Sequence, residues 1–169
     1  RHKIDSRADA DAYIARLRGI RPLFSQAEVN LKQREAKGIL PPAFVFPWAI
    51  ADCTNVLKGS PFQPDAPDST LLGDFRKKVE KLELNTKEQA ELISGAEAAL
   101  LSAVEPAYRS LIAVLEDQAT RATVSHGIWH LPDGEALYRS LLKRRTTLSM
   151  SADEIHELGL KEVARIHAD

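Results

Sequence analysis

Apolar residues follow the three- and four-residue spacing of an α-helix from Ile93 to Leu115, and this stripe constrains the fold more than any other feature. Pro106 interrupts it, because proline lacks a backbone donor and its ring clashes with the preceding turn. Thr86 and Gln89 have the spacing of a capping box, so the helix should begin there. We therefore predict one long bent helix, whose inward residues are Ile93, Ala96, Leu100, Val104, Tyr108, Leu111 and Leu115.

The N-terminal segment, residues 6–38, also has helical periodicity. Pro22 must kink this helix or split it, and we expect two packed helices that meet near Arg21. Gly38 is suited to the C-terminal cap, where a left-handed backbone is common. The inward stripe of this segment is Tyr13, Leu17, Ile20, Phe24, Ala27 and Leu31.

Two shorter helices should separate this segment from the long helix. One is predicted at about 47–57, after the rigid pair Pro41-Pro42, and the other follows a proline-rich surface loop at 59–69. Their inward positions are Phe46, Ile50, Cys53 and Leu57 in the first, and Leu71, Leu72, Phe75, Val79 and Leu82 in the second.

The last quarter of the sequence contains the most specific spacings. Leu131-Pro132-Asp133-Gly134 predicts a turn, and a helix should follow that ends in Lys143, Arg144 and Arg145, where cations suit the helix dipole. The apolar face of that helix is Leu137, Tyr138, Leu141 and Leu142.

A final helix should begin at Ser151, because Ser151 and Glu154 have capping-box spacing. We expect a close neighbour at Gly159, since glycine inside a helix costs about 1 kcal/mol relative to alanine. The expected buried side of this helix is Ile155, Leu158, Val163 and Ile166.

Together these patterns predict an all-α fold, an irregular antiparallel array of about seven helices that forms a single domain over residues 1–169. A net charge of −1 gives no electrostatic reason to bind nucleic acid or an anionic membrane. No apolar run of membrane-spanning length is evident, and a single cysteine excludes an internal disulfide framework. Arg1 is not a methionine and Asp169 ends an unbroken helical pattern, so both ends suggest a fragment.

Several histidines resemble metal or catalytic motifs incompletely. His156-Glu157 begins like HExxH, but Leu160 stands where the second histidine must be. His156 and His167 share a helix face but would lie about 16 Å apart, too far for one ion. His126 and His130 are interrupted by Gly127, although a turn could still bring them together. We predict no catalytic residue and no metal ligand in this chain.

The remaining aromatic and thiol side chains favour structural roles. Cys53 lies in an apolar run and is expected to be buried. Trp48 and Trp129 are expected to pack in a core or between domains, with an exposed binding role as the alternative. Residues 123–129 are enriched in β-branched and aromatic side chains, which indicates a short extended segment.

The order of these residues resembles a family of bacterial proteins known as domain of unknown function 885. The resemblance is specific in the last quarter and weaker upstream, at Arg16-Leu17, Gly38, Ser60-Pro61-Phe62 and Pro106-Ala107-Tyr108. The matching residues of the last quarter are Gly127, Leu131, Pro132, Asp133, Gly134, Tyr138, Leu142, Thr146, Thr147, Ser151, Glu154, Ile155, His156, Leu158, Gly159, Leu160, Glu162 and Val163.

This resemblance implies a function for a longer parent protein. Family members are several times longer, mostly helical and similar to gluzincin zinc metallopeptidases, and many are exported, some as lipoproteins. Their HExxH helix lies beyond the region that resembles this chain, so zinc and catalysis are implied for the parent, and this chain should be inactive alone. Its partners would be the catalytic domain and a peptide substrate.

Within that interpretation, residues 127–138 are expected to approach the substrate, because the turn can present backbone groups and a phenol. The candidate substrate-lining residues are Gly127, His130, Pro132, Gly134 and Tyr138. The alternative function is a stand-alone helical binding or interaction module without an enzymatic role. A third interpretation, a di-metal helical bundle, would need a second Asp-x-x-His or Glu-x-x-His pair beside Asp153 and His156, and the sequence has none.

Overall fold

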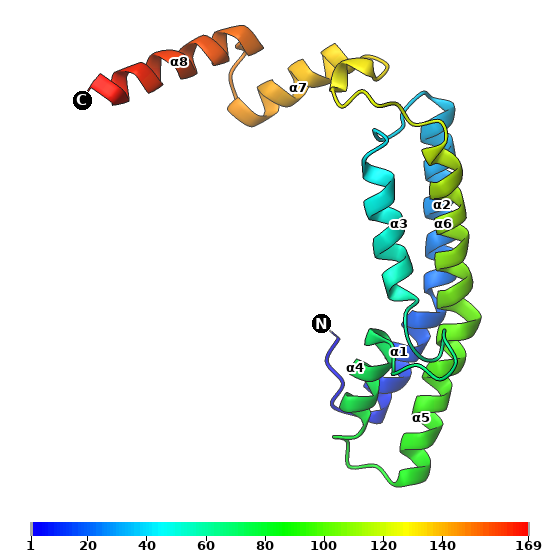
Figure 1. The fold of residues 1–169 in the computed structure, drawn as a ribbon. Coiled ribbons are helices and arrows are strands. Elements are labelled where there is room, and N and C mark those ends of the chain that lie inside the picture. Colours follow the sequence, from blue (N-terminus) through cyan, green and yellow to red (C-terminus); the bar gives the residue numbers. More distant parts are fainter. Residues whose placement is uncertain (1, 169) are drawn as a thin grey trace.

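The computed structural model describes residues 2–168, and Arg1 and Asp169, the two ends that suggested a fragment, lie outside this range. The described chain is all-α, as predicted (Figure 1). Within residues 2–168, extended pairing is limited to one isolated bridge between Ser60 and Asp68. The helices are α1 (Arg7–Arg18), α2 (Ile20–Ala36), α3 (Val45–Val56), α4 (Thr70–Val79), α5 (Thr86–Ala99), η1 (Leu100–Val104), α6 (Glu105–Ala119), η2 (Ile128–His130), α7 (Gly134–Thr146) and α8 (Ala152–Ala168).

The predicted long bent helix is present as α5, η1 and α6 in direct succession (Figure 1). Its middle, η1, is a π-helical turn that ends directly before α6, in which Pro106 occupies the first turn. Proline has no backbone N–H and cannot donate a hydrogen bond to the preceding turn. The wider π-helical turn at this point accommodates the proline without that hydrogen bond. The cap lies one residue earlier than predicted, because Asn85 and Glu88, and not Thr86 and Gln89, form the capping box.

This long helix is the axis of the body. Helices α1 and α4 pack on α5, whereas α2 and α3 pack on α6, so every helix of the body contacts the same rod. The long helix supplies much of the core together with α1 and α4, although only Ala96, Leu100 and Val104 of its predicted stripe are fully buried. The most deeply buried core side chains, all at or below 2% exposure, are Ala10, Phe46, Leu72, Phe75, Val79, Leu92, Ala96, Ala99, Leu100 and Val104.

The first two helices meet at Gly19, two residues before the predicted junction at Arg21. Pro22 lies in the first turn of α2, where a missing amide donor leaves no bond unmade. Helix α2 ends at Ala36, and Gly38, with a φ of +72°, is the left-handed residue that terminates it, as predicted. Its stripe is only half-buried, and α2 has no fully buried residue.

The long helix, Thr86–Ala119, is apolar enough by length and composition to cross a membrane, although no uninterrupted apolar run was recognised in the sequence. Core helices of water-soluble proteins pass the same test, and this helix contacts α1, α2, α3 and α4. Only 28% of its most apolar window is buried within the described chain.

Helices α7 and α8 extend away from the body as an arm, which we define as residues 134–168 (Figure 1). The helix bounds agree with the predicted ones, and Ser151 and Glu154 form the predicted capping box. The predicted buried faces are wrong within the described residues, because no element covers them. The exposed apolar side chains of the arm are Leu137, Tyr138, Leu141, Leu148, Leu158, Leu160, Val163 and Ile166.

Gly159 likewise lacks the close neighbour that we expected. A Cβ built at Gly159 would meet no atom of the described chain within 4 Å. Ile155 and Leu142 are the better covered of the apolar residues on the arm, and both are only partly buried. The reason for both failures is the same, since residues 2–168 supply no packing partner to the outer side of the arm.

Candidate functional site

The turn that leads into the arm is a compact structure built on two glycines. Residues 124–127 are irregular, with no strand, and η2 follows as a single 3₁₀ turn. A Cβ at Gly134 would overlap the backbone carbonyl of Ile128. Only glycine therefore allows these two backbone segments to lie so close together. The Gly134 amide donates to Leu131 O at 3.0 Å and closes the turn. At Gly127 a Cβ would meet the exposed indole of Trp129.

The turn is attached to the end of α2. Gly38 N donates to Glu35 O and Ile39 N donates to Arg34 O, which is the Schellman pattern of a helix that ends in a left-handed residue. A Cβ at Gly38 would lie 3.2 Å from Pro132 Cγ, so Pro132 packs closely on this glycine.

A polar network joins α2 to α6 beside the turn. Gln118 is 1% exposed, and its Nε2 donates to Leu31 O at 3.3 Å and to Glu35 Oε2 at 3.0 Å. Arg121 donates to Glu35 at 2.5 Å and to Asp117 at 2.6 Å. The hydrogen bond from Arg121 and then that from Gln118 lower the pKa of Glu35, and Arg121 likewise lowers the pKa of Asp117. Both carboxylates are therefore charged at neutral pH.

A cavity of about 350 Å³ lies between this network, the end of α2 and the turn, and we call it the α2–turn pocket. Gly127 and His130 line it, together with apolar residues of the Ile39–Pro42 segment. Two buried side-chain atoms of its lining residues have no hydrogen-bond partner among residues 2–168, namely Gln118 Oε1 and His130 Nε2. Each unsatisfied buried polar atom costs about 1–3 kcal/mol, so a donor at this position would stabilise the region.

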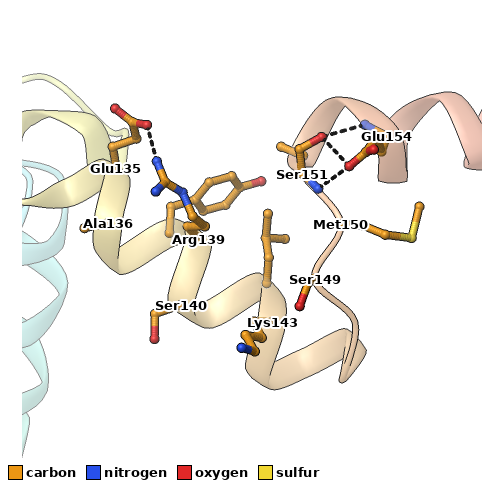
Figure 2. A pocket seen from close by; sticks show the side chains of 12 residues that line it. Glu135, Ala136, Arg139, Ser140, Lys143, Ser149, Met150, Ser151 and Glu154 are labelled. Atoms are coloured by element: carbon orange, nitrogen blue, oxygen red, sulfur yellow. Dashed lines mark hydrogen bonds and ion pairs between the residues drawn. The ribbon is translucent and has the colours of Figure 1, made fainter.

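A second cavity, of about 720 Å³, lies between α7 and α8, and we call it the arm groove (Figure 2). Tyr138 lines it, with Met150 on the connection between the two helices. Its acidic side chains are already engaged, because Glu135 pairs with Arg139 at 2.6 Å and Glu154 caps α8 through Ser151, whereas Lys143 makes no ion pair within the described chain. The groove thus offers an open surface of mixed polarity and no free acid beside a base.

The structure therefore separates the five predicted substrate-lining residues. Gly127 and His130 line the α2–turn pocket, whereas Tyr138 lines the arm groove. Pro132 and Gly134 line neither cavity and instead fix the turn between them. Their role towards a substrate stays a prediction.

Gln118, the most buried polar side chain of the α2–turn pocket, was not predicted from the sequence. A signal was present, because Gln118 continues the stripe Tyr108, Leu111, Leu115 at three-residue spacing, where an apolar residue is expected. A polar residue in such a stripe indicates a buried hydrogen-bonding role. No comparable sequence signal identified Arg34, which also lines this pocket.

The residues that could hold a metal do not converge. In residues 2–168 no three side chains of His, Cys, Asp or Glu come close enough to form a metal site. His130 hydrogen-bonds to Gly127 O, and His126 packs edge-on against Phe44 with ring centroids 5.0 Å apart. The donor set of a zinc site, three or four such ligands around one point, is therefore not met by these residues.

The aromatic and thiol predictions have mixed outcomes. Trp48 and Trp129 are 76% and 77% exposed, so neither packs in the core of the described chain. Cys53 is only partly buried, and burial raises the pKa of its thiol, so the reactive thiolate is scarce at neutral pH.

The fold and the two cavities define an all-α body with a projecting helical arm. The model of the family described as "Bacterial protein of unknown function (DUF885)" matches residues 1–169, and the chain belongs to that family.

A solved structure agrees with this assignment. The crystal structure described as "the putative lipoprotein from Colwellia psychrerythraea" is similar, with a TM-score of 0.85 and 30% sequence identity. The match covers 98% of this chain and 28% of that chain, so this chain spans little more than a quarter of the length of its relative. No curated protein matches.

Proposed function

We propose that residues 1–169 form the N-terminal helical part of a longer protein that resembles zinc-dependent metallopeptidases. In this proposal the chain forms one wall of a substrate cleft and supplies no catalytic group. The observation on which it rests is the arm, which exposes eight large apolar side chains to solvent. Exposed apolar patches of this extent are typical of surfaces that bind another protein or domain.

The occupant of that surface is proposed to be the remainder of the parent chain. The related structure is more than three times longer than the part matched here, which supports a further domain of ample size. The outer face of α8 includes Leu158, Leu160, Val163 and Ile166, all at least 48% exposed. Burial of apolar area at about 25 cal/mol per Å² would give a strong reason for α8 to dock.

Zinc belongs to the parent in this proposal. Because the described side chains do not converge on a metal position, the ligands would come from outside residues 1–169. The cleft wall would include Gly127, His130, Pro132, Gly134 and Tyr138, with a peptide as the substrate. The relationship to a lipoprotein-like structure supports an exported, membrane-anchored or periplasmic parent.

The test uses the full-length parent protein. Its zinc content is measured by elemental analysis, and turnover is measured on a peptide library, for the wild type and for Tyr138→Ala. We expect about one zinc per chain and peptide cleavage, with a higher KM in Tyr138→Ala, because a cleft wall contributes to substrate binding. Arg144→Ala, an exposed change on the same helix, is the matched control and should not alter KM.

Two results would contradict the proposal. If Tyr138→Ala left folding, KM and kcat unchanged, residues 127–138 would not line the cleft. If the parent held no zinc, cleaved no peptide and had no HExxH downstream of residue 169, the chain would instead be a helical binding module.

A further inference from the structure

Helix α3 is covered on one side only, although its first two turns are apolar all round. Residues 43–51 include no polar side chain. Phe46 is 2% exposed, whereas Phe44 and Trp48, which lie one turn apart, are 54% and 76% exposed. A helix that is apolar on every side is normally buried on every side. The described chain therefore leaves one face of α3 without the cover that its sequence indicates.

The uncovered face is a short stripe at helical spacing, which we call the α3 stripe. It begins at the N-cap of the helix, and its four residues, all exposed, are Phe44, Pro47, Trp48 and Ala51. Beyond it the exposed residues of α3 are polar, namely Asp52, Thr54 and Asn55. An apolar patch with a polar border is typical of a surface that binds another part of a protein.

The α3 stripe begins beside the connection that leads into the arm. Ala43 N donates to Thr123 O at 2.8 Å, and the rings of Phe44 and His126 pack edge-on. The arm projects from the body on the side where α3 lies (Figure 1). A folded domain placed on that side would therefore border both the arm and the α3 stripe.

The size of the stripe favours an occupant from the same chain. A fully covered aromatic side chain buries about 150–250 Å². With Phe44 and Trp48 already partly covered, the stripe supplies at most about half of the 800 Å² or so that each partner of a stable complex buries. A tethered segment does not need this area, because its effective concentration is high.

Two further observations agree with an occupant from the same chain. The related crystal structure matches body and arm together at a TM-score of 0.85, and most of its chain lies outside the match. A membrane surface fits less well, because anionic lipids attract Lys and Arg, whereas Asp52 is the one charged residue in the sequence of α3.

We propose that the α3 stripe is a second docking surface for the part of the parent chain that follows residue 169. That part then contacts the body as well as the arm, and Trp48 is the aromatic anchor of the contact. The inference rests on the proposed function for the existence of a longer parent, but it requires neither zinc nor peptidase activity.

Photo-cross-linking of the full-length parent tests this proposal. Trp48 is replaced by p-benzoylphenylalanine, and cross-linked peptides are identified by mass spectrometry, with and without vesicles of phosphatidylethanolamine and phosphatidylglycerol. We expect cross-links within one chain to peptides beyond residue 169, in a yield independent of protein concentration, because the contact is intramolecular. The same replacement at Gln33, an exposed polar position on α2, is the matched control and should give no such cross-link.

Hydroxyl-radical footprinting of the unsubstituted parent measures the same contact without a replacement at Trp48. The core of an interface is desolvated, so oxidation of Trp48 should be slower by about tenfold or more in the native parent than in the urea-unfolded parent. Oxidation at the same rate in both would show that Trp48 is uncovered, and the proposal would fail.

Other outcomes of the cross-linking would also overturn the proposal. These are cross-links from position 48 to a second copy of the chain, cross-links to lipid, or equal cross-linking from positions 33 and 48. Zinc content and peptide turnover are separate readouts. A zinc-dependent peptidase with an uncovered Trp48 would contradict only this inference, and a zinc-free parent that cross-links as expected would contradict only the proposed function.

Discussion

Single glycines give the sharpest tests at the residue scale. Gly134→Ala should open the turn before α7, because the new Cβ would overlap the Ile128 carbonyl, and the expected cost is about 1–3 kcal/mol. The measurement is hydrogen exchange at residue 134, whose amide donates to Leu131 O. Its exchange should become faster by about tenfold for each 1.4 kcal/mol lost.

Gly159→Ala is the matched control within the same arm. No described atom lies within 4 Å of the new Cβ, so in the isolated chain the change should stabilise α8 locally by about 1 kcal/mol. Circular dichroism should detect a rise in helicity. A fall in helicity would mean that residue 159 has a close neighbour after all, and exchange of Gly134→Ala as slow as that of the wild type would mean that the turn is not closed by Gly134.

A pH-dependent prediction concerns Arg121 and its two carboxylates. The pKa values of Glu35 and Asp117 are lowered in the folded chain, so their pairing stabilises the α2–α6 junction at neutral pH. The contribution is complete above the usual carboxyl pKa of about 4.5 and is lost as the pH falls through the lowered values. Arg121→Met should therefore be less stable than the wild type at pH 7 but equally stable near pH 2.

Urea unfolding at a series of pH values measures this difference. Arg144→Met is the control, because Arg144 is exposed and makes no ion pair within the described chain, and its effect should not depend on pH. A gap between Arg121→Met and the wild type that was the same at all pH values would show that the ion pairs contribute nothing.

At the scale of elements, the cap of α8 can be separated into its parts. Ser151→Ala removes the acceptor for the Glu154 amide and should cost about 1 kcal/mol of helix stability. The backbone amide and hydroxyl of Ser151 lower the pKa of Glu154, so helicity of α8 should fall in acid. Glu154→Gln keeps the capping geometry without the charge, so its helicity should be insensitive to pH between about 3 and 7. Circular dichroism that fell equally in acid for Glu154→Gln would contradict this assignment.

The elements also differ in how far the sequence determined them. Local signals predicted the helix ends well, because Gly38, Ser151 and the prolines of the loop each determine the backbone conformation at their own position. The faces of α7 and α8 were predicted wrongly because periodicity identifies an apolar side but not what covers it. Within residues 2–168 Leu158 and Val163 stay exposed, and no feature of these two residues could indicate that.

The candidate site was likewise predicted only in the part that depends on local sequence. The turn was predicted from Leu131-Pro132-Asp133-Gly134, which is local chemistry. The α2–turn pocket was not, because Arg34, Gln118 and His130 come from three distant segments and meet only through packing.

At the scale of the whole molecule, stability should be concentrated in the body. Phe75→Ala, at 0% exposure beside the long helix, should cost about 3–5 kcal/mol of unfolding free energy. Leu160→Ala on the arm should cost much less in the isolated chain, because this residue is already 53% exposed. Urea unfolding compares the two, and a large cost at Leu160 would mean that the arm packs on the body.

The central claim is that the outer face of the arm docks on the rest of a longer parent chain, and hydrogen exchange of residues 152–168 tests it most directly. The exchange is compared between the isolated chain 1–169 and the full-length parent at the same pH and temperature. We expect rapid exchange of α8 in the isolated chain and protection by at least about a hundredfold in the parent. Equal exchange in both would contradict it, because α8 would then be an uncovered arm in the complete protein.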